Sequence, residues 1–335
     1  MTEDHLGSNG LRSLMAASIR LNCIPAASID SALVTALRDA PGTGKVHSVF
    51  DRAINIVAPW GQLVTLAARQ LDDAPWTIRA EVRDWSGAGI QAGDPADFST
   101  RAISFDSADS VVLLPGAREW FAKRIPLADI TTAELGTGAA ALGGLLETHG
   151  VRGGILEAPP VEGAAEANAK APANAFDAGI AHGLRAGREA LETAVRAGDS
   201  MAIGEAALQL LGLGSGLTPA GDDFLCGLAL LAAQPGSRLG AARGALSAVV
   251  GQHPDRTTLL SWTTLREAVD GRARESLLEL LSKLFRHRAE DPAGLARHLR
   301  APVDRALGIG HTSGTDILSG LLAGLRLEKE LRGSM

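Results

Sequence analysis

The hydrophobic pattern of this sequence changes near Pro126, which limits the chain to folds that keep strands and helices apart. Between Lys45 and Leu114, short runs such as AINIVA, TIRAEV and SVVLL are rich in β-branched residues and separated by turn residues, as is typical of strands. After Pro126, apolar residues recur at helical spacing. The sequence therefore predicts an α+β protein, with an antiparallel β-rich barrel or sandwich domain over residues 1–125 and a mainly α-helical domain over residues 126–335.

A stretch rich in Pro, Ala, Gly and Glu interrupts the helical half near residues 157–175. It offers few large apolar side chains for burial, and long segments of this composition usually act as linkers. We predict a flexible connector there.

Charge and composition exclude several classes of function. The formal net charge is -6 at pH 7 and the chain has no Tyr, which argues against a nucleic-acid ligand and a base-stacking surface. The N-terminal residues have no signal-sequence pattern, and no apolar run is long enough to cross a bilayer. Cys23 and Cys226 form no CxxC pair and the eight histidines are scattered, so we predict neither a disulfide framework nor a transition-metal site. We expect a cytoplasmic protein without nucleic-acid or membrane partners.

Two segments of the helical half resemble each other. GLGSGLTPAGDDFLCGLAL begins at Gly212, and GIGHTSGTDILSGLLAG begins at Gly308. Each contains a glycine-rich loop, an aspartate at the expected start of a helix, and a glycine in the first turns of that helix. With a gap of three residues, the equivalent pairs are Gly212/Gly308, Gly214/Gly310, Gly221/Gly314, Asp223/Asp316 and Gly227/Gly320. The sequence therefore predicts a duplicated loop–helix unit, with the two loops facing one site.

These residue types suit the binding of a small anion. Glycine allows the backbone to approach a ligand closely, and the unpaired N–H groups at a helix N-terminus attract anions. Gly216 and Gly221 have the spacing of a P-loop, but Asp222 and Asp223 follow where a P-loop requires Lys and Ser or Thr. Each aspartate could simply cap its helix, or the adjacent pair could hold Mg²⁺, or the carboxylates could accept N–H bonds from a ligand.

Gly227 and Gly320 occupy helix positions where alanine would be more stable by roughly 1 kcal/mol. A close helix crossing is the simplest reason for glycine at both positions. We predict packing roles for them and no ligand contact.

The motif GLGSGLTPAGDDFLCGLAL, together with GIGHTSGTDILSGLLAG and the upstream VHSVFDRAINI, resembles the AllH family from about Val46 to the end of the chain. The resemblance implies one subunit of a bacterial oxamate carbamoyltransferase that acts in allantoin catabolism beside two unrelated subunits, AllF-like and AllG-like. The implied reaction is carbamoyl transfer between carbamoyl phosphate and oxamate, run in purine degradation toward phosphorolysis of oxalurate. No cofactor is expected for it.

The same resemblance carries a set of site residues. The catalytic candidates are Asp222, Asp223 and His311, the last because an imidazole titrates near neutral pH. In the strand half, Arg52 is a candidate for binding a substrate carboxylate, and Asn55 is a further substrate-binding candidate. The remaining substrate-binding candidates come from the two loops: Gly214, Ser215, Gly216, Thr218, Gly221, Thr312, Ser313, Gly314 and Asp316.

Two other functions stay open. One is a phosphotransferase or nucleotide-binding protein that uses Mg²⁺ at Asp222 and Asp223. The other is a structural or regulatory subunit, without catalysis of its own, that completes a partner's site. An oligomer fits each of these functions.

Overall fold

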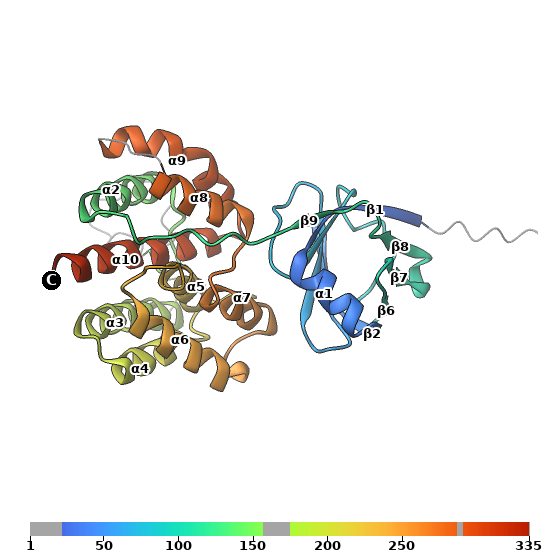
Figure 1. Cartoon of the computed structure of the whole chain (residues 1–335). Helices are drawn as coiled ribbons and strands as arrows, with labels where there is room; N and C mark the ends of the chain where they lie inside the picture. The colour runs from blue at the N-terminus through green and yellow to red at the C-terminus, as the bar shows by residue number, and fades with distance from the viewer. Residues whose placement is uncertain (1–21, 157–174, 287–290, 335) are drawn as a thin grey trace, which may run out of the picture. The chain divides into compact units, whose positions relative to one another are not determined.

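The computed structural model describes residues 22–156, 175–286 and 291–334. The chain divides into two compact units between Trp120 and Phe121, five residues before the boundary expected from the sequence. A β-barrel forms the first unit and helices form the second, so the predicted fold class is confirmed (Figure 1). The predicted connector lies almost entirely outside the described residues.

Eight of the strands described in the first unit close into a barrel. Their order is β5-β4-β3-β2-β6-β7-β8-β1, the ring closes because β1 also pairs with β5, and β9 extends the sheet beside β1. The strands are β1 (Asn22–Asp30), β2 (Gly42–Phe50), β3 (Ala53–Val57), β4 (Leu63–Ala68), β5 (Thr77–Ala80), β6 (Pro95–Phe98), β7 (Ala102–Phe105), β8 (Ser110–Leu113) and β9 (Arg118–Trp120). Closure leaves no free edge within the ring, which protects the sheet from pairing with other chains.

The sequence predicts an antiparallel barrel or sandwich, whereas the observed barrel contains both parallel and antiparallel strand pairs. β4 and β5 are parallel because the eight residues between them, 69–76, return the chain to the end where β4 begins. β1 is parallel to both β8 and β9 and antiparallel to β5. The alternation of apolar and polar residues is the same in a parallel and in an antiparallel strand. The hydrophobic pattern therefore could not distinguish these two kinds of pairing.

Apolar side chains fill the barrel and the space beneath one helix. Ile54, Ile56 and Ile78 are fully buried, as the alternation of apolar and polar residues in these strands requires. Helix α1 (Ser31–Asp39) buries Leu33 and Leu37 in the same core. The first unit therefore has a hydrophobic core of its own.

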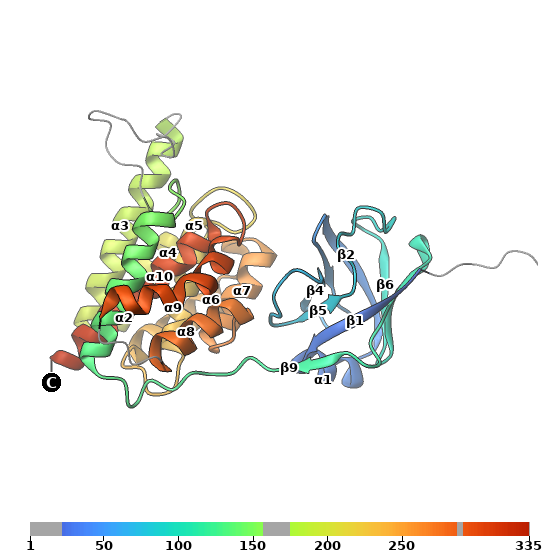
Figure 2. The same cartoon turned by 90° about the horizontal axis from the view of Figure 1, so that it is seen from above.

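The second unit is a bundle centred on two helices. Figure 1 shows α5 and α10 in its middle, with α2, α8 and α9 on one side and α3, α4 and α6 on the other, and Figure 2 shows the same helices from above. All thirteen residues of α5 are buried, so it is the core helix of the unit. The helices are α2 (Thr132–His149), α3 (Ala175–Ala197), α4 (Ser200–Leu210), α5 (Ala220–Ala232), α6 (Gly240–Gln252), α7 (Leu259–Val269), α8 (Glu275–Arg286), α9 (Pro292–Leu307) and α10 (Ser313–Gly333). Two 3₁₀ turns, η1 (Asp106–Ala108) and η2 (Pro254–Arg256), complete the described elements.

The two central helices cross at the predicted glycines. A Cβ at Gly227 would lie 1.9 Å from the carbonyl oxygen of Ile317, and a Cβ at Gly320 would lie 1.9 Å from the carbonyl oxygen of Phe224. The contacts are reciprocal, since Phe224 and Ile317 follow the equivalent aspartates of the two repeats. The predicted packing role of Gly227 and Gly320 is therefore confirmed.

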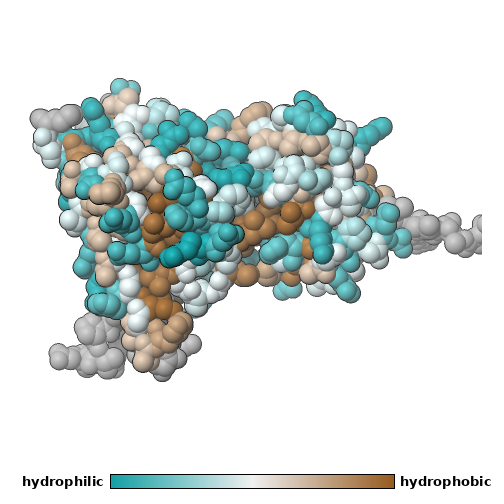
Figure 3. Space-filling view, turned by 90° about the horizontal axis from the view of Figure 1, so that it is seen from below, coloured by the Kyte–Doolittle hydropathy of each residue, from teal (hydrophilic) through white to brown (hydrophobic). Residues whose placement is uncertain are grey.

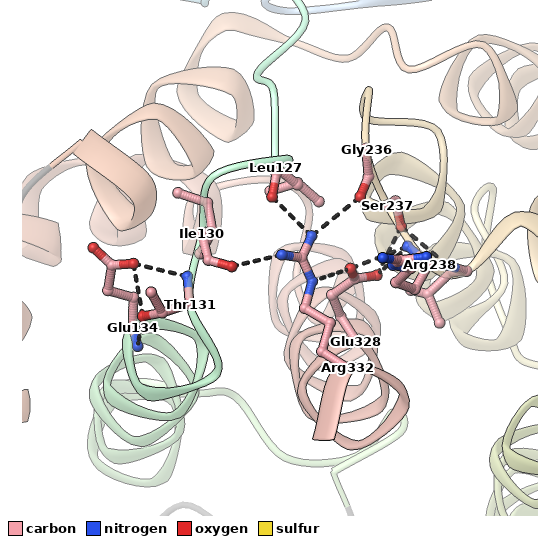
Figure 4. Close-up of polar contacts among 10 residues, drawn as sticks. Leu127, Ile130, Thr131, Glu134, Gly236, Ser237, Arg238, Glu328 and Arg332 are labelled. Carbon is pink, nitrogen blue, oxygen red and sulfur yellow. Dashed lines mark hydrogen bonds and ion pairs between the residues drawn. The ribbon is translucent and has the colours of Figure 1, made fainter. Parts of the chain in front are cut away.

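A buried ion pair fastens the segment before α2 to the helical unit (Figure 4). Glu328 is fully buried and accepts hydrogen bonds from Arg332 Nε at 2.7 Å and from the backbone N–H of Arg238 at 2.8 Å. Arg332 in turn donates to the carbonyl oxygens of Ile130 at 2.5 Å and Leu127 at 2.7 Å. Both oxygens of Glu328 and all three nitrogens of Arg332 take part in hydrogen bonds, which offsets the cost of burying these charges.

Within the described ranges, no helix combines the length and apolar character that a membrane span requires.

Candidate functional site

Each repeat in the second unit consists of two helices joined by a glycine loop. One loop connects α4 to α5 and the other connects α9 to α10. A Cβ at Gly221 would lie 2.1 Å from the carbonyl oxygen of Leu210, and a Cβ at Gly314 would lie 2.0 Å from that of Ala306. In both repeats, glycine thus lets the second helix begin directly against the last turn of the first. The predicted duplication is confirmed in three dimensions.

The first loop is the longer of the two and has the more unusual backbone. Gly212, Gly214 and Gly216 have φ values of 79°, 132° and 96°, in the region that side chains rarely adopt. In the second loop only Gly310 has such a value, 59°. This difference follows from the three-residue gap between the repeats.

Asp222 holds the first loop in place. Its Oδ1 accepts the N–H of Gly212 at 2.7 Å, and its Oδ2 accepts the hydroxyl groups of Ser261 at 2.7 Å and of Thr257. Burial raises the pKa of its carboxyl, and these three hydrogen bonds lower it. Because protein groups occupy both oxygens, the structure assigns Asp222 a positioning role, and our prediction of a catalytic role for it has no support from these contacts.

Asp223 and Asp316 differ from Asp222 because each has an oxygen without a partner. Asp223 is 3% exposed and Asp316 is fully buried. The Oδ2 atoms of both are buried and accept no hydrogen bond from the described protein. Such oxygens are rare and costly in a folded protein, and they are candidates for contact with a ligand.

Hydroxyl groups from both loops surround Asp223. Thr218 Oγ1 and Ser313 Oγ are hydrogen-bonded to each other at 2.8 Å, which joins the first loop to the start of α10. Both hydroxyls lie close enough to the Asp223 carboxyl to lower its pKa. The predicted site residues Thr218, Ser313, Asp223 and Asp316 are therefore brought together.

Both carboxyls are poised to exchange a proton near neutral pH. The pKa of Asp223 is raised to about 8, first by burial and then by the charges of Asp316 and Asp222, against hydrogen bonds from Ser313 and Thr218 that lower it. The pKa of Asp316 is raised to about 7 by burial, against hydrogen bonds from the N–H of Ile155 and from Thr312. Paired carboxyls with pKa values raised toward neutral pH are a common feature of acid–base sites.

The segment after α2 covers Asp316, and sequence reasoning missed it. The N–H of Ile155 donates to Asp316 Oδ1 at 2.7 Å, and the N–H of Val151 donates to Thr315 Oγ1 at 2.9 Å. A Cβ at Gly154 would lie 2.3 Å from Asp316 Oδ1, so glycine is required there. The pair Gly153-Gly154 is the sequence signal for a close backbone approach in this segment. Nothing in the sequence shows that the backbone approaches the second repeat.

Three other loop candidates face solvent. Ser215 and Gly216 are exposed at the tip of the first loop, and His311 is exposed in the second. Their positions fit contacts with a ligand that approaches from outside. Their predicted roles stay predictions.

Arg52 and Asn55 belong to the first unit, whereas the loops belong to the second. Arg52 is exposed. Asn55 is 4% exposed, donates to Ser48 Oγ at 3.1 Å and accepts from Thr65 Oγ1 at 2.8 Å. This ladder of polar side chains links β2, β3 and β4, so Asn55 has a structural role in the barrel.

Within the described ranges, no group of three or more His, Cys, Asp or Glu side chains is arranged to hold a metal ion. A hollow of about 240 Å³ on α8 and α9 is lined by Ser282, Lys283, Arg286 and His298. It contains none of the residues of the duplicated loops. We therefore place the candidate site at Asp223 and Asp316.

Two family models match the chain. One is described as the AllH family N-terminal domain and matches residues 25–119, and the other is described as oxamate carbamoyltransferase subunit AllH and matches residues 210–325. The second match includes both glycine loops and both buried carboxyls. No solved structure matches the chain.

Proposed function

This chain belongs to the AllH family, and we propose that it is the subunit of an oxamate carbamoyltransferase that binds a small anionic substrate between its two glycine loops. One observation carries this proposal: the buried carboxyls of Asp223 and Asp316 stand at equivalent positions of a duplicated unit, each with one oxygen left without a partner. The family description suggests the class of reaction, and we propose the two carboxyls as part of the substrate-binding site.

The chemistry has three requirements. In the proposed reaction the amide nitrogen of oxamate attacks the carbonyl carbon of carbamoyl phosphate, a C–N bond forms, the C–O bond to phosphate breaks, and the nitrogen loses a proton. In the reverse direction phosphate attacks oxalurate, and the departing nitrogen regains the proton. The enzyme must hold the anionic groups, orient the amide and move this proton.

The described residues match these needs. Backbone N–H groups of the Gly214–Thr218 loop, together with the hydroxyls of Thr218 and Ser313, are donors suited to phosphate or a carboxylate. Asp316 accepts the N–H of Ile155, so its carboxyl is an acceptor in this structure. With a pKa of about 7, it is suited to take the proton from the amide nitrogen at neutral pH.

The family description as a subunit implies other subunits, and we propose AllF-like and AllG-like partners. On the face drawn in Figure 3, hydrophobic patches lie among hydrophilic surface. Phe176 and Met201 of the second unit are 74% and 75% exposed, which suits contact with another protein.

We expect Asp316→Asn to reduce turnover of the assembled enzyme by about 100-fold or more, because the amide side chain cannot accept the proton. The measurement is formation of oxamate and carbamoyl phosphate from oxalurate and phosphate, with this chain combined with its partner subunits. Asp255→Asn, which makes the same change at an exposed position of η2, should retain full activity.

Two results would point elsewhere. Full activity of a folded Asp316→Asn enzyme would show that the carboxyl takes no part in catalysis and would favour a non-catalytic subunit. Binding of ATP only in the presence of Mg²⁺, without binding of oxamate, oxalurate or carbamoyl phosphate, would favour the phosphotransferase instead.

A further inference from the structure

The two unpartnered carboxyl oxygens restrict the chemical group that can occupy the site. An oxygen buried without a hydrogen bond destabilises the free protein, so a ligand that supplies the missing partner recovers this cost on binding. Asp223 Oδ2 and Asp316 Oδ2 are both in this state. The hydrogen bond between Thr218 and Ser313 joins the two loops, and the charge of Asp316 acts on the nearby Asp223 carboxyl. A ligand group that supplies a partner to both carboxyls is therefore favoured.

The contacts of the two carboxyls are not equivalent. Asp316 Oδ1 accepts the backbone N–H of Ile155, and an N–H can only donate, so that oxygen carries no proton. The groups beside Asp223 are the hydroxyls of Thr218 and Ser313, which can donate or accept and so tolerate a neutral carboxyl. Asp223 is also the carboxyl with the higher pKa, about 8 against about 7. The N–H of Ile155 favours the ionised form of Asp316, so Asp223 is the better holder when the pair binds one proton.

The groups near the two carboxyls also favour a neutral Asp223. Asp222 adds repulsion that raises the pKa of Asp223, and Cys226 on the same helix is a fully buried thiol whose pKa is raised well above its ordinary value. Among the described residues, no Lys, Arg or His contributes to the shifts of either carboxyl. A ligand carboxylate placed there would meet negative charge without a compensating cation.

A pair with one proton offers one donor and one acceptor. A primary amide has the complementary pattern, since its oxygen accepts and its NH₂ group donates. We propose that Asp223 and Asp316 together recognise the primary amide end of the ligand, with neutral Asp223 donating to the amide oxygen and ionised Asp316 accepting one amide N–H. This inference rests on the proposed function and assigns Asp223 a specificity-determining role that is distinct from proton transfer.

Three ligands of nearly the same size test whether the site prefers an amide, a carboxylate or an ammonium group. Oxamate has an amide and a carboxylate, oxalate replaces the amide by a second carboxylate, and glycine replaces it by an ammonium group without the carbonyl oxygen. With the full-length chain in calorimetric titrations at pH 7, we expect the Kd of oxamate to be at least about 10-fold lower than that of either analogue, the discrimination typical of a site with buried polar partners.

Removal of the proton should weaken oxamate binding. At pH 9 both carboxyls are ionised, the donor to the amide oxygen is lost, and the wild-type Kd should rise by about 10-fold, the factor expected one pH unit above a pKa of about 8. Asp223→Asn keeps an N–H donor at every pH, so its oxamate Kd should be nearly the same at pH 7 and pH 9. Asp255→Asn should behave like the wild type.

Each contrary outcome has a distinct meaning. Equal affinity for oxamate and oxalate, or tightest binding of glycine, would overturn amide recognition and leave a ligand site at the loops. The comparison of ligands uses wild-type protein alone, so it decides the question even where the variant does not fold. Loss of oxamate binding in folded Asp223→Asn at pH 7 would overturn the donor role of Asp223. If none of the three ligands binds, the proposed function falls with the inference.

Discussion

Replacement of Gly227 by alanine is expected to lower the free energy of unfolding by roughly 3 kcal/mol. The new Cβ would lie 1.9 Å from the carbonyl oxygen of Ile317 and 2.6 Å from the backbone nitrogen of Leu321. These are backbone atoms of the central helix α10, so no side-chain rotation can relieve the clash and the two helices must separate. Gly320→Ala should have a similar effect, because its Cβ would lie 1.9 Å from the carbonyl oxygen of Phe224.

Gly244→Ala is the matched control. Gly244 lies on the exposed face of α6, and a Cβ there would meet nothing within 4 Å. The greater helix propensity of alanine should stabilise this variant by up to about 1 kcal/mol. Chemical denaturation of the three proteins measures both effects. Equal stability of Gly227→Ala and Gly244→Ala would show that the helices do not cross as described.

The stability of the protein is expected to fall as the pH rises from about 4 to about 8, because of Asp223 and Asp316. Both have folded-state pKa values above the ordinary 3.8, so the folded state binds more protons than the unfolded state in this window. For Asp316, the difference between 3.8 and about 7 corresponds to an upper limit of roughly 4 kcal/mol at pH 8 and above. Below pH 4 the carboxyl is protonated in both states and contributes nothing.

Asp316→Asn isolates this contribution, because asparagine remains neutral at every pH. We expect the variant to exceed the wild type in stability by roughly 2–4 kcal/mol at pH 9 and to show little of this advantage at pH 4. Urea denaturation at several pH values measures the difference. An advantage that does not depend on pH, or a less stable variant at pH 9, would contradict the raised pKa.

The repeat could be predicted from the sequence because it depends on local backbone requirements. Gly221 and Gly314 must lack a side chain where each helix begins, and Gly227 and Gly320 must lack one where the helices cross. In each repeat these requirements leave one glycine two residues before the aspartate and another four residues after it. The duplicated loop–helix unit could therefore be predicted from the spacing of glycine and aspartate in the sequence.

Features that depend on tertiary contacts could not be predicted in this way. The bond from the N–H of Ile155 to Asp316 joins residues 161 positions apart, and nothing near Asp316 in the sequence indicates it. Asp222 and Asp223 look alike in the sequence, yet only Asp222 meets Thr257 and Ser261 across the packing of α5 on α7. Local pattern predicted most strands between Lys45 and Leu114, but it did not predict β1, β6 or β9. The parallel pairing of β1 depends on which strands close the ring.

The central claim is that Asp223 and Asp316 form a proton-holding ligand site, and carbon-13 NMR of the full-length chain labelled at the aspartate carboxyl carbons tests it most directly. We predict two resonances that titrate near pH 7 and pH 8, that disappear one at a time in Asp316→Asn and Asp223→Asn, and that shift when oxamate is added. If every aspartate titrates below about pH 5, or if oxamate leaves both resonances unchanged, the two carboxyls are structural groups and the claim is wrong.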